Sequence, residues 1–184
     1  MAEYYLIAQL PSLDAVNENM PLPINEDYFL EICGRFLNKK AKDEIKDLTL
    51  APSLDQIKSG SPLIQSWNEG ERFLRLALAK ARAKKMKKSF DYDGPLPDEL
   101  LKVADAAVEF ESPMEAEKFL FNHRISFLER LRPADAFSEE FVFYYGLKLK
   151  LLIRIRQFDA KAGEAAYKNI YNTILGEDRL EAIQ

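Results

Sequence analysis

The most hydrophobic part of the chain lies between Phe141 and Tyr171, and its first half contains no acidic residue. Placed on a helix, its apolar side chains cover almost the whole circumference. The polar side chains form only a narrow strip at Lys150, Arg154 and Gln157, with Lys148 and Arg156 standing alone elsewhere. A helix that is apolar nearly all round is typical of the buried centre of a bundle.

The same stretch also contains a strand-like pattern. Residues 147–151 and 153–156 alternate between apolar and basic, with the period of two that is typical of strands. Against a strand, the apolar pattern continues from Glu139 to Phe158 without a turn, which is much longer than a usual strand. Ser138 before Glu139 and Glu140 is typical of a helix N-cap with acidic residues in the first turn. We therefore predict a helix here and keep a strand as the alternative.

Elsewhere, helical spacing of apolar residues and capping residues predict further helices. Their expected ranges are Asn25–Leu37, Lys39–Leu48, Ser61–Lys88, Pro97–Phe110, Ser112–Arg132 and Ala160–Leu175, each accurate to a few residues. Gly70 is expected to soften the middle of the longest one. The apolar run Tyr4–Leu10 fits either a short N-terminal strand or a packed helical turn, because periodicity cannot separate them at this length.

Together these elements predict an all-α fold, a helical bundle. A chain of 184 residues suits a single helical domain over residues 1–184 or two small helical lobes. Residues 89–97 (SFDYDGPLP) form a turn-rich linker, which is the one candidate lobe boundary.

Composition indicates a cytoplasmic protein. The single cysteine, Cys33, excludes an internal disulfide and suits a reducing compartment. No apolar run approaches the roughly 20 residues that span a bilayer. The N-terminal residues include Glu3 and lack the basic start of a signal peptide. The net charge of −4 argues against a dedicated nucleic-acid binder.

The end of the longest predicted helix is strongly basic. It carries six cations in nine residues, at Lys80, Arg82, Lys84, Lys85, Lys87 and Lys88. Without them the net charge of −4 would be −10. They could simply complement the helix dipole. They could instead bind an acidic protein partner or anionic lipid headgroups. Nucleic acid is a weaker alternative, because no aromatic residues are interleaved with these cations.

Residues with catalytic potential are scarce. Cys33 lies on an apolar helical stripe and is best explained as a small buried hydrophobic residue. His123, the only histidine, has no second histidine or cysteine near it and is interpreted as a structural or surface residue. The chain lacks glycine-rich phosphate loops and the common zinc, redox and serine-nucleophile motifs. We therefore predict a non-enzyme with no cofactor and no metal.

Both ends of the chain contain stretches with a family resemblance. YYLIAQLPSL near the N-terminus is followed by Leu22-Pro23-Ile24, and the C-terminal half contains Tyr144-Tyr145, the run 147–152 and the segment Asp159–Gly163. These stretches resemble an uncharacterised bacterial family found beside V-type ATPase genes. That family is similar to the C subunit of V/A-type ATPases (the d subunit in eukaryotes), a helical and non-catalytic protein of about twice this length.

The resemblance implies a coupling or assembly protein that docks between the central stalk and the membrane ring of such an ATPase. It would lie on the cytoplasmic side, peripheral to the membrane and not inserted. Partner contacts are expected at Lys80, Lys84, Lys85, Lys87 and Lys88. The alternatives are a stand-alone cytosolic helical adaptor that binds another protein, and an enzyme that uses carboxylates and lysines on a helical scaffold.

Overall fold

The computed structural model describes residues 2–14, 16, 20–53, 59–92, 94–157, 167–168 and 170–171. These residues contain helices and no strand, which confirms the all-α prediction. The helices are α1 (Ala2–Gln9), α2 (Glu26–Phe36), α3 (Lys39–Asp47), α4 (Pro62–Lys85), α5 (Asp98–Glu109), α6 (Pro113–Arg130) and α7 (Glu139–Arg156).

The predicted N-caps are present at the start of several helices. The side chains of Asn25, Ser61 and Ser138 each accept a hydrogen bond from the backbone amide three residues later. Pro62 occupies the first position of α4, where the amide hydrogen that proline lacks would have no helical partner. Ser112 caps α6 in the same way. Local sequence therefore determines where these helices begin.

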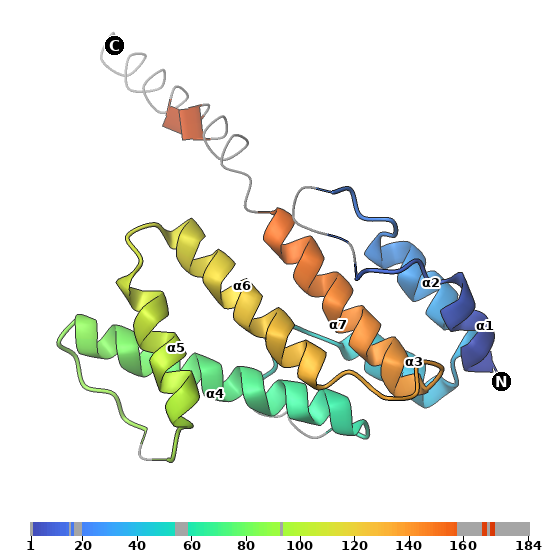
Figure 1. Ribbon diagram of the computed structural model, residues 1–184, viewed down its shortest axis with the longest axis horizontal. Coiled ribbons are helices and arrows are strands. Elements are labelled where there is room, and N and C mark those ends of the chain that lie inside the picture. Colours follow the sequence, from blue (N-terminus) through green and yellow to red (C-terminus); the bar gives the residue numbers. More distant parts are fainter. Residues whose placement is uncertain are drawn as a thin grey trace, which may run out of the picture.

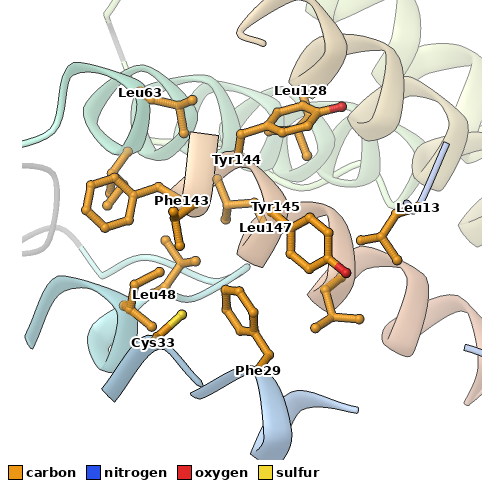
Figure 2. Close-up of a cluster of buried hydrophobic side chains, with 14 of the residues drawn as sticks. Leu13, Phe29, Cys33, Leu48, Leu63, Leu128, Phe143, Tyr144, Tyr145 and Leu147 are labelled. Carbon is orange, nitrogen blue, oxygen red and sulfur yellow. The ribbon is translucent and has the colours of Figure 1, made fainter. Parts of the chain in front are cut away.

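Helix α7 is the centre of the molecule, and the strand alternative for this stretch is wrong. The helix lies beside α6, while α1, α2 and α3 cover its other side (Figure 1). Eleven of its eighteen residues are buried, and Val142, Phe143 and Leu147 are fully so. Figure 2 shows side chains from several elements gathered around Phe143 and Leu147. A strand would place alternate side chains on opposite faces, whereas only a helix can turn this apolar sequence toward neighbours on all sides.

The N-terminal run is also a helix, so the strand considered for residues 4–10 does not form. Leu6 is fully buried, and Ile7 and Leu10 pack against the same cluster. Leu6 and Ile7 are neighbours within α1, and Leu10 directly follows the helix, with its amide donating to the Ile7 carbonyl at 3.1 Å. Tyr4 and Tyr5 lie on the exposed side.

Two hydrophobic clusters make up the core. The larger surrounds α7 and includes Trp67 of α4. The smaller is built from alanines and leucines of α4, α5 and α6: Leu74, Ala77, Leu78, Ala81, Ala104, Ala107 and Leu120. Helix α4 therefore contributes its first half to one cluster and its second half to the other.

Helix boundaries agree with the predicted ones to within a turn, and the end of α4 differs most. Helix α4 ends at Lys85 and not at about Lys88, because Lys87 adopts a positive φ of 55° that ends the helix. The described part of residues 89–97 is non-helical and joins α4 to α5. The division into lobes at this linker stays a prediction. The helix expected at Ala160–Leu175 lies mostly outside the described residues, although 167, 168, 170 and 171 are helical.

Candidate functional site

The basic end of α4, defined as Lys80, Arg82, Lys84, Lys85, Lys87 and Lys88, lies on the surface. All six side chains are exposed. Across the described ranges, Lys80, Lys84, Lys87 and Lys88 take part in no ion pair within 4.0 Å. The structure therefore brings these cations together at one end of one helix, where they can meet a partner.

The backbone at this end forms a Schellman motif. The Lys88 amide donates to the Ala83 carbonyl at 2.9 Å, and the Lys87 amide donates to the Lys84 carbonyl at 3.1 Å. The motif places Lys87 in the left-handed region, where glycine is the usual residue because a side chain there costs energy. The sequence thus keeps a cation at a position that favours glycine.

One of the lysines has a structural contact as well. Lys85 Nζ donates to the carbonyl of Val108, near the C-terminal end of α5. The carboxyl ends of α4 and α5 therefore meet here, and both carry the partial negative charge of a helix C-terminus. Lys85 therefore helps to neutralise the partial negative charge of the two helix ends, and this contact does not involve the other five cations.

A groove between α4, α5 and α6 is a second candidate site, which sequence analysis did not predict. Its volume is about 350 Å³, within the range of ligand pockets. Its lining combines apolar and polar side chains. The apolar lining is Phe73, Leu74, Pro97, Leu100, Phe127 and Leu131, and the polar residues include Ser66, Glu69, Glu99, His123 and Arg130.

Gly70 lies in the α4 wall of this groove, and α4 continues through it from Pro62 to Lys85. The softening expected at this residue stays a prediction. A Cβ atom built at Gly70 would lie 2.5 Å from two ring carbons of Phe127 on α6. Glycine is therefore needed for the close approach of α4 and α6. Phe127 in turn stacks against Trp67, with ring centroids 6.0 Å apart.

A buried ion pair between Glu71 and Arg124 forms part of the groove lining beside Gly70. Arg124 of α6 donates to both carboxylate oxygens of Glu71 at 2.9 Å, and Glu71 is only 2% exposed. Arg75 adds a third hydrogen bond to Glu71 at 3.1 Å. The two bonds from Arg124 thus join α6 to α4, while the bond from Arg75 lies within α4.

His123 lines the groove and has no metal-ligand partners. Burial, followed by the positive charge of Arg130, lowers the pKa of the imidazole below its usual value. The ring is therefore neutral at pH 7. No group of three or more His, Cys, Asp and Glu side chains suited to a metal ion occurs in the part of the chain that the structure describes.

Lys148 is buried and hydrogen-bonded, which its isolated position in the sequence pattern did not indicate. It appeared as an isolated cation on an apolar surface, but it is 7% exposed and tightly bonded. Its Nζ donates to Asp14 Oδ1 at 2.7 Å and to Glu129 Oε1 at 2.8 Å. The Tyr144 hydroxyl also donates to Glu129 Oε1, at 2.7 Å. Arg132 lies 3.6 Å from Asp14.

The side chains of Lys148 and Tyr144 in this cluster stay protonated at neutral pH. Burial would lower the pKa of Lys148, but hydrogen bonds to Asp14 and Glu129 outweigh it and hold that pKa above its usual value. Burial raises the pKa of Tyr144 to about 12, and its hydrogen bond to Glu129 acts in the same direction. A lysine that stays protonated is neither a base nor a nucleophile. The cluster links the segment after α1 to α6 and α7.

Cys33 is confirmed as a small buried hydrophobic residue, 1% exposed in the larger cluster. Burial raises the pKa of its thiol to about 12, which suppresses the reactive thiolate.

Comparison with other proteins gives no assignment. No protein-family model, curated protein or solved structure matches the chain. The resemblance to the V-type ATPase-associated family therefore stays a prediction. Among the described helices, none combines the length and the apolar character needed to cross a membrane.

Proposed function

We propose that this chain is a non-catalytic coupling or assembly protein, similar to the C subunit of V-type ATPases, that docks between the central stalk and the membrane ring. It would act in the cytoplasm, peripheral to the membrane, through protein partners and without nucleic acid or a cofactor. The resemblance of both ends of the chain supports the ATPase assignment, and the helical fold is compatible with it.

The observation that carries the docking role is the exposed basic end of α4. Lys80, Lys84, Lys87 and Lys88 are accessible and take part in no ion pair within the described ranges. Surface charges of this kind contribute little to folding but steer association with an oppositely charged surface. The contact should weaken as salt rises, since the screening length falls to about 8 Å at physiological ionic strength. An acidic protein surface is therefore the expected partner chemistry.

Affinity purification of the tagged chain from native membranes and cytosol tests this proposal. The test variant reverses Lys80, Lys84 and Lys88 to glutamate, and leaves Lys85 and Lys87 in their structural positions. A matched control reverses three exposed lysines elsewhere, Lys39, Lys46 and Lys102. Both variants change the net charge equally, so a difference between them reports position and not total charge.

We expect stalk and ring subunits to co-purify with the wild type and the control, and to be lost with the test variant. Recovery of ATPase subunits with all three proteins would show that the basic end is not the interface. Salt-sensitive recovery of a different cytosolic protein, again lost with the test variant, would instead establish the adaptor alternative. Circular dichroism checks that each variant is folded.

A further inference from the structure

An exposed apolar face lies on the C-terminal part of the chain. Tyr167, Ile170 and Tyr171 are 66%, 61% and 51% exposed, and all three are helical. Their spacing places them on one side of a helix, and the two tyrosine rings stack with centroids 6.0 Å apart. Figure 1 shows this short segment well apart from α1–α7. Three large side chains in this arrangement are typical of a helix that packs into a groove on another surface.

The groove between α4, α5 and α6 has the complementary chemistry. Its apolar lining can take the rings and the isoleucine, while His123 and Glu99 in the same lining can bond tyrosine hydroxyls. Glu69, an exposed lining residue, is opposite in charge to Lys168, which lies next to Tyr167. A pocket of about 350 Å³ holds anchor side chains of this kind and not a whole helix.

The groove lies too far from the end of α7 for Tyr167, Ile170 and Tyr171 of the same chain to reach it. Helices α6 and α7 are antiparallel, because Glu129 bonds Tyr144 while Glu117 bonds Arg154. The groove residues near Glu129 are therefore level with the first half of α7. Gln157, where the described part of α7 ends, is thirteen residues beyond Tyr144, or about 20 Å further along the helix axis.

The chain between Gln157 and Tyr167 would have to cover that distance and also cross α6, whose packing adds about 10 Å. Ten residues span about 15 Å as a helix and about 35 Å when fully extended. The sequence predicts a helix from about Ala160, so the connection would reach only about 20 Å, short of the roughly 30 Å along α7 and over α6. A second copy of the chain has no such restriction.

We propose that Tyr167, Ile170 and Tyr171 of one copy pack into the α4–α5–α6 groove of a second copy. Exchange in both directions gives a closed twofold dimer. This inference does not rest on the proposed ATPase role, because it uses neither the basic end of α4 nor the family resemblance.

Sedimentation and light scattering of the full chain from about 1 to about 200 μM test the proposal. The tail variant replaces Tyr167, Ile170 and Tyr171 with serine. The groove variant, Ser66→Arg, places a long side chain in the groove lining from an exposed position. Gln65→Arg, on the neighbouring exposed position outside the groove, is the control.

We expect the wild type and the control to dimerise, and each of the other variants to raise the dimer dissociation constant by about tenfold or more. An equimolar mixture of tail and groove variants should form a weak 1:1 complex, because one intact tail then meets one intact groove. A wild type that stays monomeric over the whole range overturns the proposal. A dimer that survives both variants also overturns it, since another surface then holds the copies together.

Discussion

Replacing Gly70 with alanine measures how tightly α4 and α6 are packed. Alanine is more favourable than glycine in a helix by about 1 kcal/mol, so an unhindered substitution should stabilise the protein. At Gly70 the new Cβ would lie 2.5 Å from two ring carbons of Phe127, about 1 Å inside normal carbon contact. The ring cannot simply retreat, because Trp67 stacks beside it. Overpacking of this kind costs about 1–3 kcal/mol, so after the helix gain of about 1 kcal/mol the net expectation is a destabilisation of up to about 2 kcal/mol.

Gly34 supplies the matched control, since it lies in α2 and nothing is within 4 Å of its built Cβ. Gly34→Ala should therefore stabilise the protein by about 0.5–1 kcal/mol. Urea unfolding followed by circular dichroism separates the variants. With a slope of about 2 kcal/mol/M, Gly70→Ala should lower the midpoint by up to about 1 M, and Gly34→Ala should raise it. A Gly70→Ala midpoint raised as far as that of Gly34→Ala would refute the reasoning, because the Phe127 ring would then make room for the new Cβ without cost.

Three further predictions concern stability. Lys87→Gly should stabilise the protein by about 1 kcal/mol by relieving a left-handed side chain, whereas Lys84→Gly within the helix should destabilise it by about as much; urea midpoints test both. Leu152→Ala should cost about 2–5 kcal/mol because the side chain is 3% exposed beside the main cluster, and a cost below about 0.5 kcal/mol would contradict its burial. The free energy of unfolding should fall as pH drops below about 4.5. The hydrogen bond from Lys148 lowers the pKa of Asp14, and at Glu129 the opposing effect of burial is outweighed by hydrogen bonds from Lys148 and Tyr144. Both carboxylates therefore stabilise the fold above their unfolded pKa values and lose that effect as pH falls through the folded ones; Asp14→Asn with Glu129→Gln should flatten the pH dependence.

Local sequence was sufficient to predict most of the helices. Asn25, Ser61, Ser112 and Ser138 cap helices as expected, because a cap involves only residues within one turn. The length of the apolar run decided correctly between helix and strand for α7. The basic end of α4 is exposed, and its role as a partner contact stays a prediction.

Long-range partners could not be predicted in the same way. Lys148 bonds Asp14, which is 134 residues away, and nothing near Lys148 in the sequence indicates this. The groove likewise depends on three helices meeting, and Gly70 was interpreted through its own helix when its contact is with Phe127. Such features become visible only when separate elements are placed in space.

The sharing of α4 between two clusters has a consequence for local opening. The larger cluster holds Trp67, Phe143 and other bulky side chains, whereas four of the seven buried residues of the smaller one are alanines. Segments with little buried apolar area open most easily, so amide hydrogens of α5 should exchange with solvent faster than those of α7. The amides of α4 should then become less protected from its first half to its second. A partner bound at the basic end would slow exchange in the part of the molecule that opens most readily.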